Sequence, residues 1–185
     1  MSLVPNAVEI AQSERQPAFG GVDIQQAFAQ FVTGVVVVVA SNSRERAIAR
    51  VQAFNSVSLD PALVLWSLEK CSDAFPVFKR ASHFAAHVLA HEQRALMQQG
   101  SAIDQSSFAG AEDPSEKAGA HKAAFDGCSA WFECAGIGYF DGGDHGCFIG
   151  RIENFSFSET RPLITYAGAY RALCVHPDAH PGSPQ

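Results

Sequence analysis

The pattern of apolar and polar positions along the chain predicts a fold made mostly of short β-strands. Val35–Ala40 is an uninterrupted apolar run of valines ending in alanine, which is typical of a strand buried on both faces. Between Ile48 and Val57 apolar residues recur among polar ones, which indicates a strand buried on one face. A polar turn, 41–45, separates the two segments, so we expect them to form a hairpin.

A hydroxyl-rich segment, Ser56–Pro61 (SVSLDP), follows the second strand and precedes another apolar run, Leu63–Trp66. We interpret it as an elbow between two strands, in which Ser56, Ser58 and the backbone offer hydrogen-bonding groups beside an apolar floor. Such a surface suits a flat aromatic ligand with a polar edge. The residues alone leave a second interpretation open, which is an ordinary strand, turn and strand without a ligand.

Two helix starts are visible in the first half of the chain. Asp23 is expected to cap a helix over 24–31, whose apolar residues predict that it lies against the strands. Ser72 or Asp73 is expected to cap a second helix that ends at Arg80.

The later part of the chain predicts further strands and one more helix. The expected strands are 83–89, 129–140, 147–157 and 163–171, and the expected helix is 91–99, with Leu96 facing inward. The whole chain holds roughly six or seven β segments without regular alternation of strand and helix, which excludes a doubly wound α/β fold. The predicted fold class is therefore mainly β, a closed antiparallel barrel with a few short helices.

The length of 185 residues fits one domain with a single core, which we place at residues 22–173. The polar segment 1–21 has no sustained period and is expected to be a flexible arm. The proline-bearing segment 174–185 is expected to be a disordered tail. The Ser- and Gly-rich segment 101–119 is expected to be a long surface loop, with a lid over the site as one role.

Composition excludes several classes of protein. The net charge of −6 and the lack of a Lys/Arg cluster argue against a nucleic-acid partner. Five cysteines without metal-like spacing, and no secretory signal, indicate a reducing cytoplasm. No apolar run is long enough to cross a bilayer, so no membrane association is expected. His176 and His180 are spaced like metal ligands, but Pro177 prevents a regular helix between them, and we predict no metal site.

Five segments, in order and in register, resemble the flavin reductase family. They are TGVVVVVAS (33–41), AIARVQAFNSVSLDPALVLWSLEK (47–70), HFAAHVLAHEQ (83–93), GDHGCFIGRI (143–152) and PLITYAGAYR (162–171). The resemblance implies an FMN-binding split barrel, a Greek-key-like antiparallel barrel that forms homodimers. It also implies an oxidoreductase that uses NADH or NADPH to reduce FMN or FAD, with the reduced flavin serving a partner monooxygenase.

The resemblance also implies which residues form the site. His145, in the GDH turn, is implied to contact and position the nicotinamide nucleotide without transferring a proton. Hydride transfer between two bound cofactors asks the protein mainly to orient two rings, and the chain shows no catalytic triad, P-loop or GxGxxG that would suggest other chemistry. The implied cofactor-binding positions are Arg50, Val51, Gln52, Ala53, Ser56, Val57, Ser58, Lys70, Ser72, Asp73, Ala74, His87, Gln93 and Tyr170.

Two stretches depart from the family pattern. The family usually has Gly, Met, Thr, Val, Asn and Ser where this chain has Ile48–Ala53, and hydroxyl residues where it has Asp73 and Ala74. Losing one hydroxyl bond to a phosphate costs roughly 1.5 to 3 kcal/mol, so we predict weaker or re-routed flavin binding. Arg50 offers compensation as a phosphate anchor, because a guanidinium binds phosphate through two donors; alternatively, it points outward and pairs with an acid.

These departures keep other interpretations open. One is a non-catalytic or repurposed flavin- or ligand-binding protein on the same scaffold, and another is an oxidoreductase that holds its flavin permanently. His87 occupies a position where the family usually has Asn, and it is either a ligand contact or a core histidine whose ring nitrogens are hydrogen-bonded within the fold. Tyr170 lies either at the ligand mouth or in the core. Cys71 is a reactive thiol if Lys70 lowers its pKa, and otherwise a small apolar filler.

Overall fold

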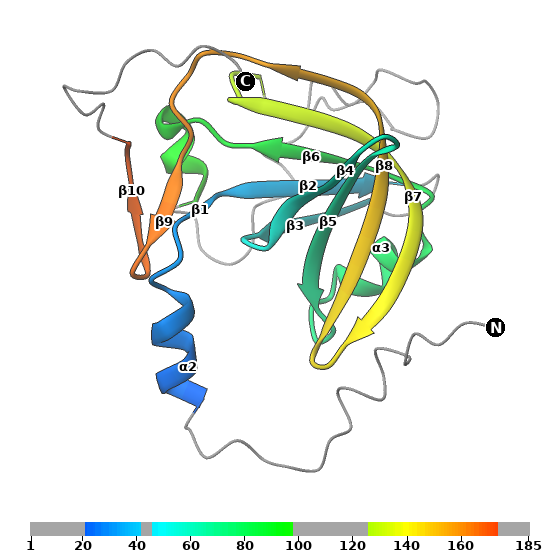
Figure 1. Cartoon of the computed structure of the whole chain (residues 1–185), viewed down its shortest axis with the longest axis horizontal. Helices are drawn as coiled ribbons and strands as arrows, with labels where there is room; N and C mark the ends of the chain where they lie inside the picture. The colour runs from blue at the N-terminus through cyan, green and yellow to red at the C-terminus, as the bar shows by residue number, and fades with distance from the viewer. Residues whose placement is uncertain (1–20, 42–45, 98–125, 174–185) are drawn as a thin grey trace.

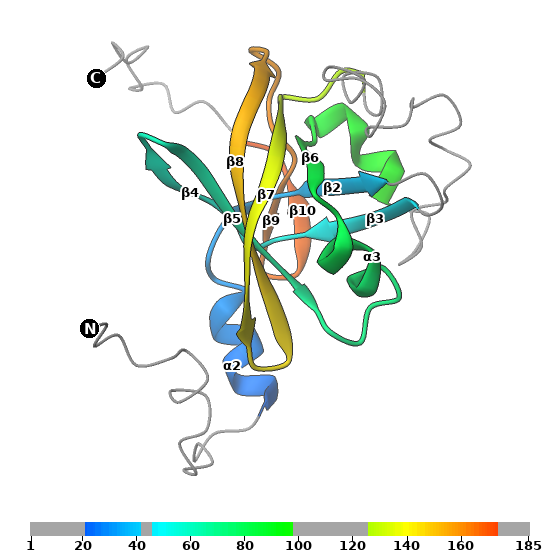
Figure 2. The ribbon, with the colours of Figure 1, turned by 90° about the vertical axis from the view of Figure 1, so that its right-hand side faces the viewer.

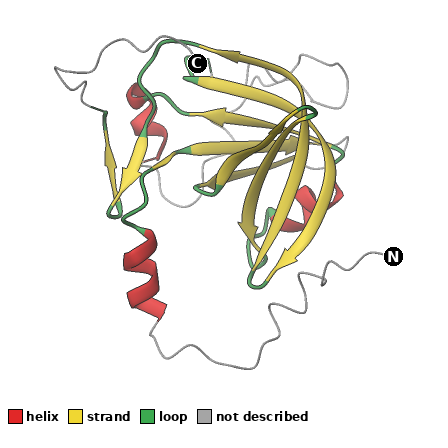
Figure 3. Cartoon of the chain, in the orientation of Figure 1, coloured by secondary structure: helices red, strands yellow, loops and turns green. Residues whose placement is uncertain are grey.

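The structure of the chain is a computed structural model that describes residues 21–41, 46–97 and 126–173. Strands predominate among them (Figure 3). The strands are β1 (Thr33–Gly34), β2 (Val36–Ser41), β3 (Arg46–Val51), β4 (Phe54–Leu59), β5 (Ala62–Glu69), β6 (His83–Val88), β7 (Ala130–Gly142), β8 (His145–Phe157), β9 (Ile164–Tyr166) and β10 (Ala169–Arg171). The helices are α2 (Gly21–Phe28), α3 (Phe75–Arg80) and the 3-10 helix η1 (His91–Met97). The expected arm up to residue 20, the surface loop and the C-terminal tail lie outside the described residues.

Seven strands form one curled antiparallel sheet in the order β3-β2-β6-β7-β8-β5-β4 (Figures 1 and 2). A second sheet has the order β1-β9-β10. The predicted mainly β, antiparallel split barrel is confirmed. The expectation of a closed barrel is not met by strand pairing, because β3 and β4 lie at the two edges of the seven-stranded sheet. These edge strands are joined through Gln52 and Ala53 and not by ladder hydrogen bonds.

The valine run forms the centre of the fold, as its pattern predicts. In β2, Val36 and Val38 belong to a core that also holds Trp66 and the phenylalanines of α3. Val37 and its odd-numbered neighbours belong to a second core with Leu163, on the opposite face of the strand. The predicted hairpin is also confirmed, since β2 pairs with β3 along its whole length.

The segment Ser56–Pro61 is not an elbow. Its first four residues belong to strand β4, which pairs with β5, and only Asp60 and Pro61 make the turn. The sharp bend comes earlier, at Gln52 and Ala53, so the predicted single strand from residue 48 to 57 is two strands. Strand β4 is an edge strand with mostly exposed side chains, which explains why serines occur there without interrupting it.

Helix α2 begins at Gly21, so Asp23 lies within the helix and does not cap it. Its predicted packing against the strands is wrong within this chain, because Phe28 and Phe31 are 69% and 72% exposed. The helix projects away from the seven-stranded sheet (Figure 1). The amphipathic pattern establishes an apolar face but does not specify which surface covers it.

The segment after β6 is a 3-10 helix, where the sequence predicted an α-helix. Its predicted orientation is confirmed, because Leu96 packs against the second core and Met97 is buried in it. Among the helices of the described residues, none has the length and apolar character needed to cross a bilayer.

Candidate functional site

The corner between β3 and β4 brings the first implied cofactor-binding residues to the surface. Gln52 and Ala53 are exposed there, and Phe54 N donates to Gln52 O at 3.2 Å. Ser67 N donates to Ala53 O at 3.2 Å, which fixes the corner against β5. The Val51 side chain is 3% exposed and lies in the core, so only its backbone is available for the implied contact with a ligand.

Strand β4 continues from the corner along the edge of the sheet. Ser56 and Val57 are exposed, Ser58 is half-buried, and the pairing with β5 shifts register between the two serines. Because β4 has a strand neighbour on one side only, the backbone of its other side is open within the described part of the chain. This edge gives a planar ligand access to backbone donors and acceptors.

Lys70 follows β5 and binds the turn between β7 and β8. Its backbone N donates to Asp144 O at 2.9 Å. Its ammonium group donates to Asp141 Oδ1 and to Gly143 O, both at 2.5 Å. The hydrogen bond from Lys70 holds the pKa of the Asp141 carboxyl below its usual value, helped by a bond from Gly143 N at 3.1 Å. The charge of Lys70 is therefore already compensated, and the lysine holds the hairpin turn.

The segment between β5 and α3, which begins at Lys70, presents a hydroxyl group and a carboxylate. Ser72 Oγ accepts a hydrogen bond from Ala74 N at 3.3 Å, while the exposed Asp73 lies between them. Helix α3 begins at Phe75 with Ala74 as its N-cap, so the expected cap at Ser72 or Asp73 is wrong. The reason is local, because the serine hydroxyl closes a turn two residues long just before the helix.

Cys71 is exposed, and its thiol is not activated. Its Sγ donates to Glu69 Oε2 at 3.4 Å, and this bond is the main cause that raises the pKa of the Cys71 thiol. The expectation that Lys70 lowers this pKa is wrong, because the Lys70 ammonium is directed to Asp141.

His145 begins β8 at the tip of the β7–β8 hairpin and is half-buried. Its Nδ1 lies 2.7 Å from Asp144 Oδ1. This contact lowers the pKa of the Asp144 carboxyl, through the hydrogen bond first and the charge second. In the sheet, His145 pairs with Glu69 at the end of β5, one residue before Lys70. With Nδ1 donating to the carboxylate, Nε2 is the ring atom left to accept a hydrogen bond.

Arg50, His87 and Tyr170 form a separate group on the other face of β3 and β2. Arg50 pairs with Val37 across β2, and Val37 pairs with His87 in β6, so these side chains share one face. Arg50 Nη1 donates to Tyr170 Oη at 2.8 Å. The alternative in which Arg50 pairs with an acid is not what the structure shows, since this partner is a phenol. His87 is 1% exposed, and Tyr170 packs against the second core.

Gln93 forms hydrogen bonds inside the fold. Its Oε1 accepts from Ala90 N at 2.9 Å, and its Nε2 donates to Asp126 O at 3.1 Å. The side chain thus joins η1 to the segment that leads into β7. Both polar ends of the Gln93 side chain therefore have a partner within the fold.

The implied residues therefore fall into two groups. One follows β4 and β5 from the β3–β4 corner to the turn at Lys70 and then to His145, and the other contains Arg50, His87 and Tyr170. Three residues of the first group were missed by the sequence analysis: Ser67, Asp141 and Asp144. The acidic residues of the turn DGGDHG were the available signal for two of them.

The residues of the first group fit a flavin better at its ring end than at its phosphate end. The ring end has exposed backbone and the small side chain of Ala53. At the phosphate end, Lys70 is neutralised, and the carboxylates of Glu69, Asp73 and Asp141 repel an anion. The Ser72 hydroxyl remains a donor there. Among the described residues, no group of three or more His, Cys, Asp or Glu side chains is placed to bind a metal ion.

Residues 28–174 match the family model described as a flavin reductase like domain. The reductase component of the flavin-dependent trigonelline monooxygenase of Acinetobacter baylyi is 37% identical over 149 residues, which cover 80% of this chain and 47% of that protein. The FMN reductase (NADH) SmoA of Agrobacterium fabrum is 35% identical over 150 residues, which cover 79% of this chain and 82% of that protein. The chain thus spans about half the length of the first relative and most of the second.

Two solved structures extend the comparison. BorF, the flavin reductase component of a bacterial two-component tryptophan halogenase, has 28% identity and a TM-score of 0.72, over 85% of this chain and 100% of that chain. SgcE6 of Streptomyces globisporus, an NADH:FAD oxidoreductase in complex with NAD and FAD fragments, has 25% identity and a TM-score of 0.73, over 91% and 100%. These likenesses lend no support to the non-catalytic alternative. The fold, the order of the site residues and the match over most of its length agree that this chain belongs to the flavin reductase family.

Proposed function

We propose that this chain is an NADH-dependent flavin reductase that reduces FMN or FAD and passes the reduced flavin to a partner monooxygenase. One observation carries the proposal. The end of β5 binds both the β3–β4 corner, through Ser67, and the β7–β8 turn, through Lys70. These two anchor points are three residues apart, or about 10 Å in extended chain. The same strand therefore positions both the β3–β4 corner, where we place the flavin ring, and the turn that carries His145. The activity named for SmoA supports NADH as the donor and FMN as an acceptor.

The protein's contribution to this reaction is placement. A flavin and a nicotinamide supply the hydride chemistry when both are bound. The β3–β4 corner and the β4 edge offer backbone hydrogen-bonding groups to the polar rim of the flavin ring. His145, oriented by Asp144, presents Nε2 as an acceptor for the amide of a nicotinamide. Lys70 holds the turn that carries His145, so it acts as a positioning residue and not as a phosphate ligand.

The phosphate of the flavin needs a partner other than Lys70. Arg50 is exposed, carries a permanent positive charge and has a neutral partner, Tyr170, which leaves that charge uncompensated by this contact. Ser72 supplies a hydroxyl donor in the turn. We therefore retain Arg50 as the proposed phosphate or pyrophosphate anchor. His87 is proposed as a core histidine beneath this group.

A homodimer is the proposed assembly. Phe28, the last residue of helix α2, and Phe31, just after the helix, are exposed, and Val32 is 49% exposed. Tyr166, 40% exposed, lies next to this segment and donates to Gln30 Oε1 at 3.2 Å. An apolar face of this kind favours burial against another protein surface, and a second copy of the chain supplies one with the same features.

The remaining parts of the proposal concern partner and compartment. The relative from Acinetobacter baylyi is named as a monooxygenase reductase component, which supports a monooxygenase as the recipient of the electrons. The four cysteines of the described residues, Cys71, Cys128, Cys134 and Cys147, are free thiols. This supports a reducing cytoplasm.

The deciding experiment is an assay of NADH oxidation by the purified chain, after its absorbance spectrum has been recorded. We expect oxidation of NADH to depend on added FMN or FAD, and NADPH to be the poorer donor. A flavin spectrum in the purified protein with turnover that needs no added flavin would instead indicate a permanently held cofactor. NADH oxidation that no flavin stimulates would reject the proposal.

A further inference from the structure

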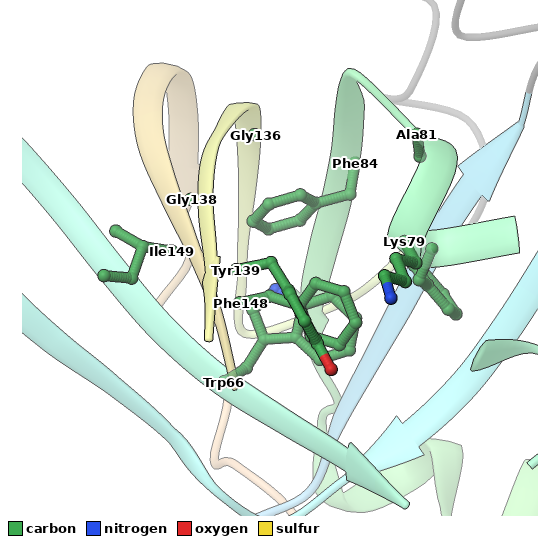
Figure 4. Close-up of a pocket in the computed structure, with 10 residues that line it drawn as sticks. Trp66, Lys79, Ala81, Phe84, Gly136, Gly138, Tyr139, Phe148 and Ile149 are labelled. Atoms are coloured by element: carbon green, nitrogen blue, oxygen red, sulfur yellow. The ribbon is translucent and has the colours of Figure 1, made fainter. Parts of the chain in front are cut away.

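A pocket of about 140 Å³ opens at the end of the curled sheet where α3 packs, and none of the implied flavin or nicotinamide residues lines it. Its floor consists of the buried rings of Trp66, Phe78, Phe84 and Phe148, and Tyr139 forms one wall. Figure 4 shows Trp66, Phe84, Tyr139 and Phe148 converging on the same space. A volume of about 150 Å³ is enough to hold a benzene-sized molecule in a protein interior. The pocket therefore suits one aromatic ring.

The rim of this pocket is open because two of its residues have no side chain. Gly136 and Gly138 are exposed on β7 on either side of a register shift against β8. At Gly138 an added Cβ would meet nothing closer than Ile149 Cβ at 3.9 Å. Sterically, a side chain is tolerated at Gly138, and its absence leaves the entrance free.

Two polar groups distinguish the pocket from ordinary core packing. Trp66 is 1% exposed, and its Nε1 has no hydrogen-bond partner among the described residues. The ammonium of Lys79 lies at the rim, 5.0 Å from the centre of the Tyr139 ring, and its side chain is otherwise exposed. Within the described residues, no ion pair neutralises Lys79. The cation at the entrance calls for an anionic group on the ligand, and the unpartnered indole N–H makes Trp66 a spectroscopic reporter in the pocket lining.

From this arrangement, we infer a second ligand site, for a small aromatic carboxylate whose ring enters the pocket formed by Trp66, Phe84 and Phe148 and whose carboxylate binds Lys79. The site is separate from the proposed flavin surface at the β3–β4 corner and along β4, because none of the residues implied to bind flavin or nicotinamide lines the pocket. The ring supplies apolar contact, and the carboxylate determines specificity.

The test uses benzoate as the probe and the full-length chain without added flavin. The chain has only two tryptophans, so Trp131→Phe assigns the indole N–H resonance of Trp66 in a proton–nitrogen correlation spectrum. We expect benzoate to shift this resonance in a saturable way, and toluene, which lacks the carboxylate, to bind more weakly. Lys79→Met should weaken benzoate by about fivefold or more, and Lys79→Arg should restore most of the affinity.

Arg94→Met is the control, because it removes one exposed positive charge outside the pocket. It should leave benzoate affinity within about twofold of the wild type. The shift should also persist when FMN is present in excess. The inference is overturned if benzoate leaves the Trp66 resonance unmoved, if Lys79→Met and Arg94→Met weaken binding equally, or if FMN displaces benzoate.

Discussion

Arg50 Nη1 donates to Tyr170 Oη at 2.8 Å, across 120 residues of sequence, and this bond joins edge strand β3 to the C-terminal hairpin β9–β10. The resemblance to the family implies that both residues bind the ligand, which stays a prediction. The phenol holds the guanidinium in place without neutralising it, which is the arrangement that an anion site requires.

Replacing Arg50 with alanine tests whether that guanidinium binds the flavin phosphate. A charged hydrogen bond is worth about 1.5 to 3 kcal/mol, so the dissociation constant for FMN should rise about tenfold or more. Riboflavin, which has no phosphate, should be affected little. Arg171→Ala is a matched control, since Arg171 is exposed and its guanidinium makes one hydrogen bond to the described residues, to the backbone O of Tyr170 at 3.5 Å. An FMN affinity in Arg50→Ala within about twofold of the wild type would refute the anchor.

Lys70→Met should loosen the turn that carries His145. The lysine makes three bonds to this turn, to Asp144 O, Asp141 Oδ1 and Gly143 O. Only the two side-chain bonds are lost in the variant, so we expect the KM for NADH to rise about fivefold, with a smaller change in FMN affinity. Steady-state kinetics and FMN titration measure the two effects separately.

Arg94→Met is the control for that experiment, because it also replaces a positively charged side chain with methionine but lies in η1, away from the turn. Lys70→Arg should recover part of the loss by supplying donors to the same oxygens. If Lys70→Met weakens FMN instead and leaves the KM for NADH unchanged, Lys70 is a phosphate ligand after all.

The carboxyls of Asp141 and Asp144 make stability depend on pH in the acid range. Both have a pKa in the folded state below the unfolded value, because each accepts a hydrogen bond from a basic side chain. Their stabilising effect is therefore complete above the unfolded pKa of about 4 and is lost as the pH falls through the lower folded pKa. Urea unfolding of the wild type and Asp141→Asn should differ at neutral pH and converge in acid. A difference that stays constant into the acid range would contradict this assignment.

Gly150 is required by close packing in the core. A Cβ built there would lie 2.4 Å from Phe84 Cζ and 3.0 Å from Cys134 Cβ. Gly150→Ala should therefore lower the free energy of unfolding by about 1 to 3 kcal/mol, because buried rings must shift to admit the methyl group. Gly138→Ala is the matched control on the neighbouring strand, where the nearest atom is 3.9 Å away. Equal stability of the two variants in denaturant unfolding would show that the core adapts at no cost.

The sequence predicts the parts of this fold that depend on local pattern. The valine run is buried on both faces because its side chains alternate between two cores, as an uninterrupted apolar strand requires. The prediction of an elbow at SVSLDP is wrong, because an exposed edge strand carries serines and other polar residues much as a loop does. The bond between Arg50 and Tyr170 was beyond prediction, since nothing local relates residues 120 positions apart. The same holds for Lys70, whose partner Asp141 comes from another hairpin.

The sequence pattern also does not show which surface covers the exposed phenylalanines at the end of α2 and just after it. These residues lead to a prediction about assembly. The double variant Phe28→Ser/Phe31→Ser should convert the proposed homodimer to a monomer. In a twofold dimer it removes four phenylalanines, each worth about 1.5 to 3 kcal/mol of burial, which weakens association by roughly a thousandfold or more. Gln25→Ser/Gln26→Ser is the matched control, since it alters exposed polar residues of the same helix. Size-exclusion chromatography with light scattering measures the mass; a monomeric wild type, or a double phenylalanine variant that stays dimeric, would exclude this interface.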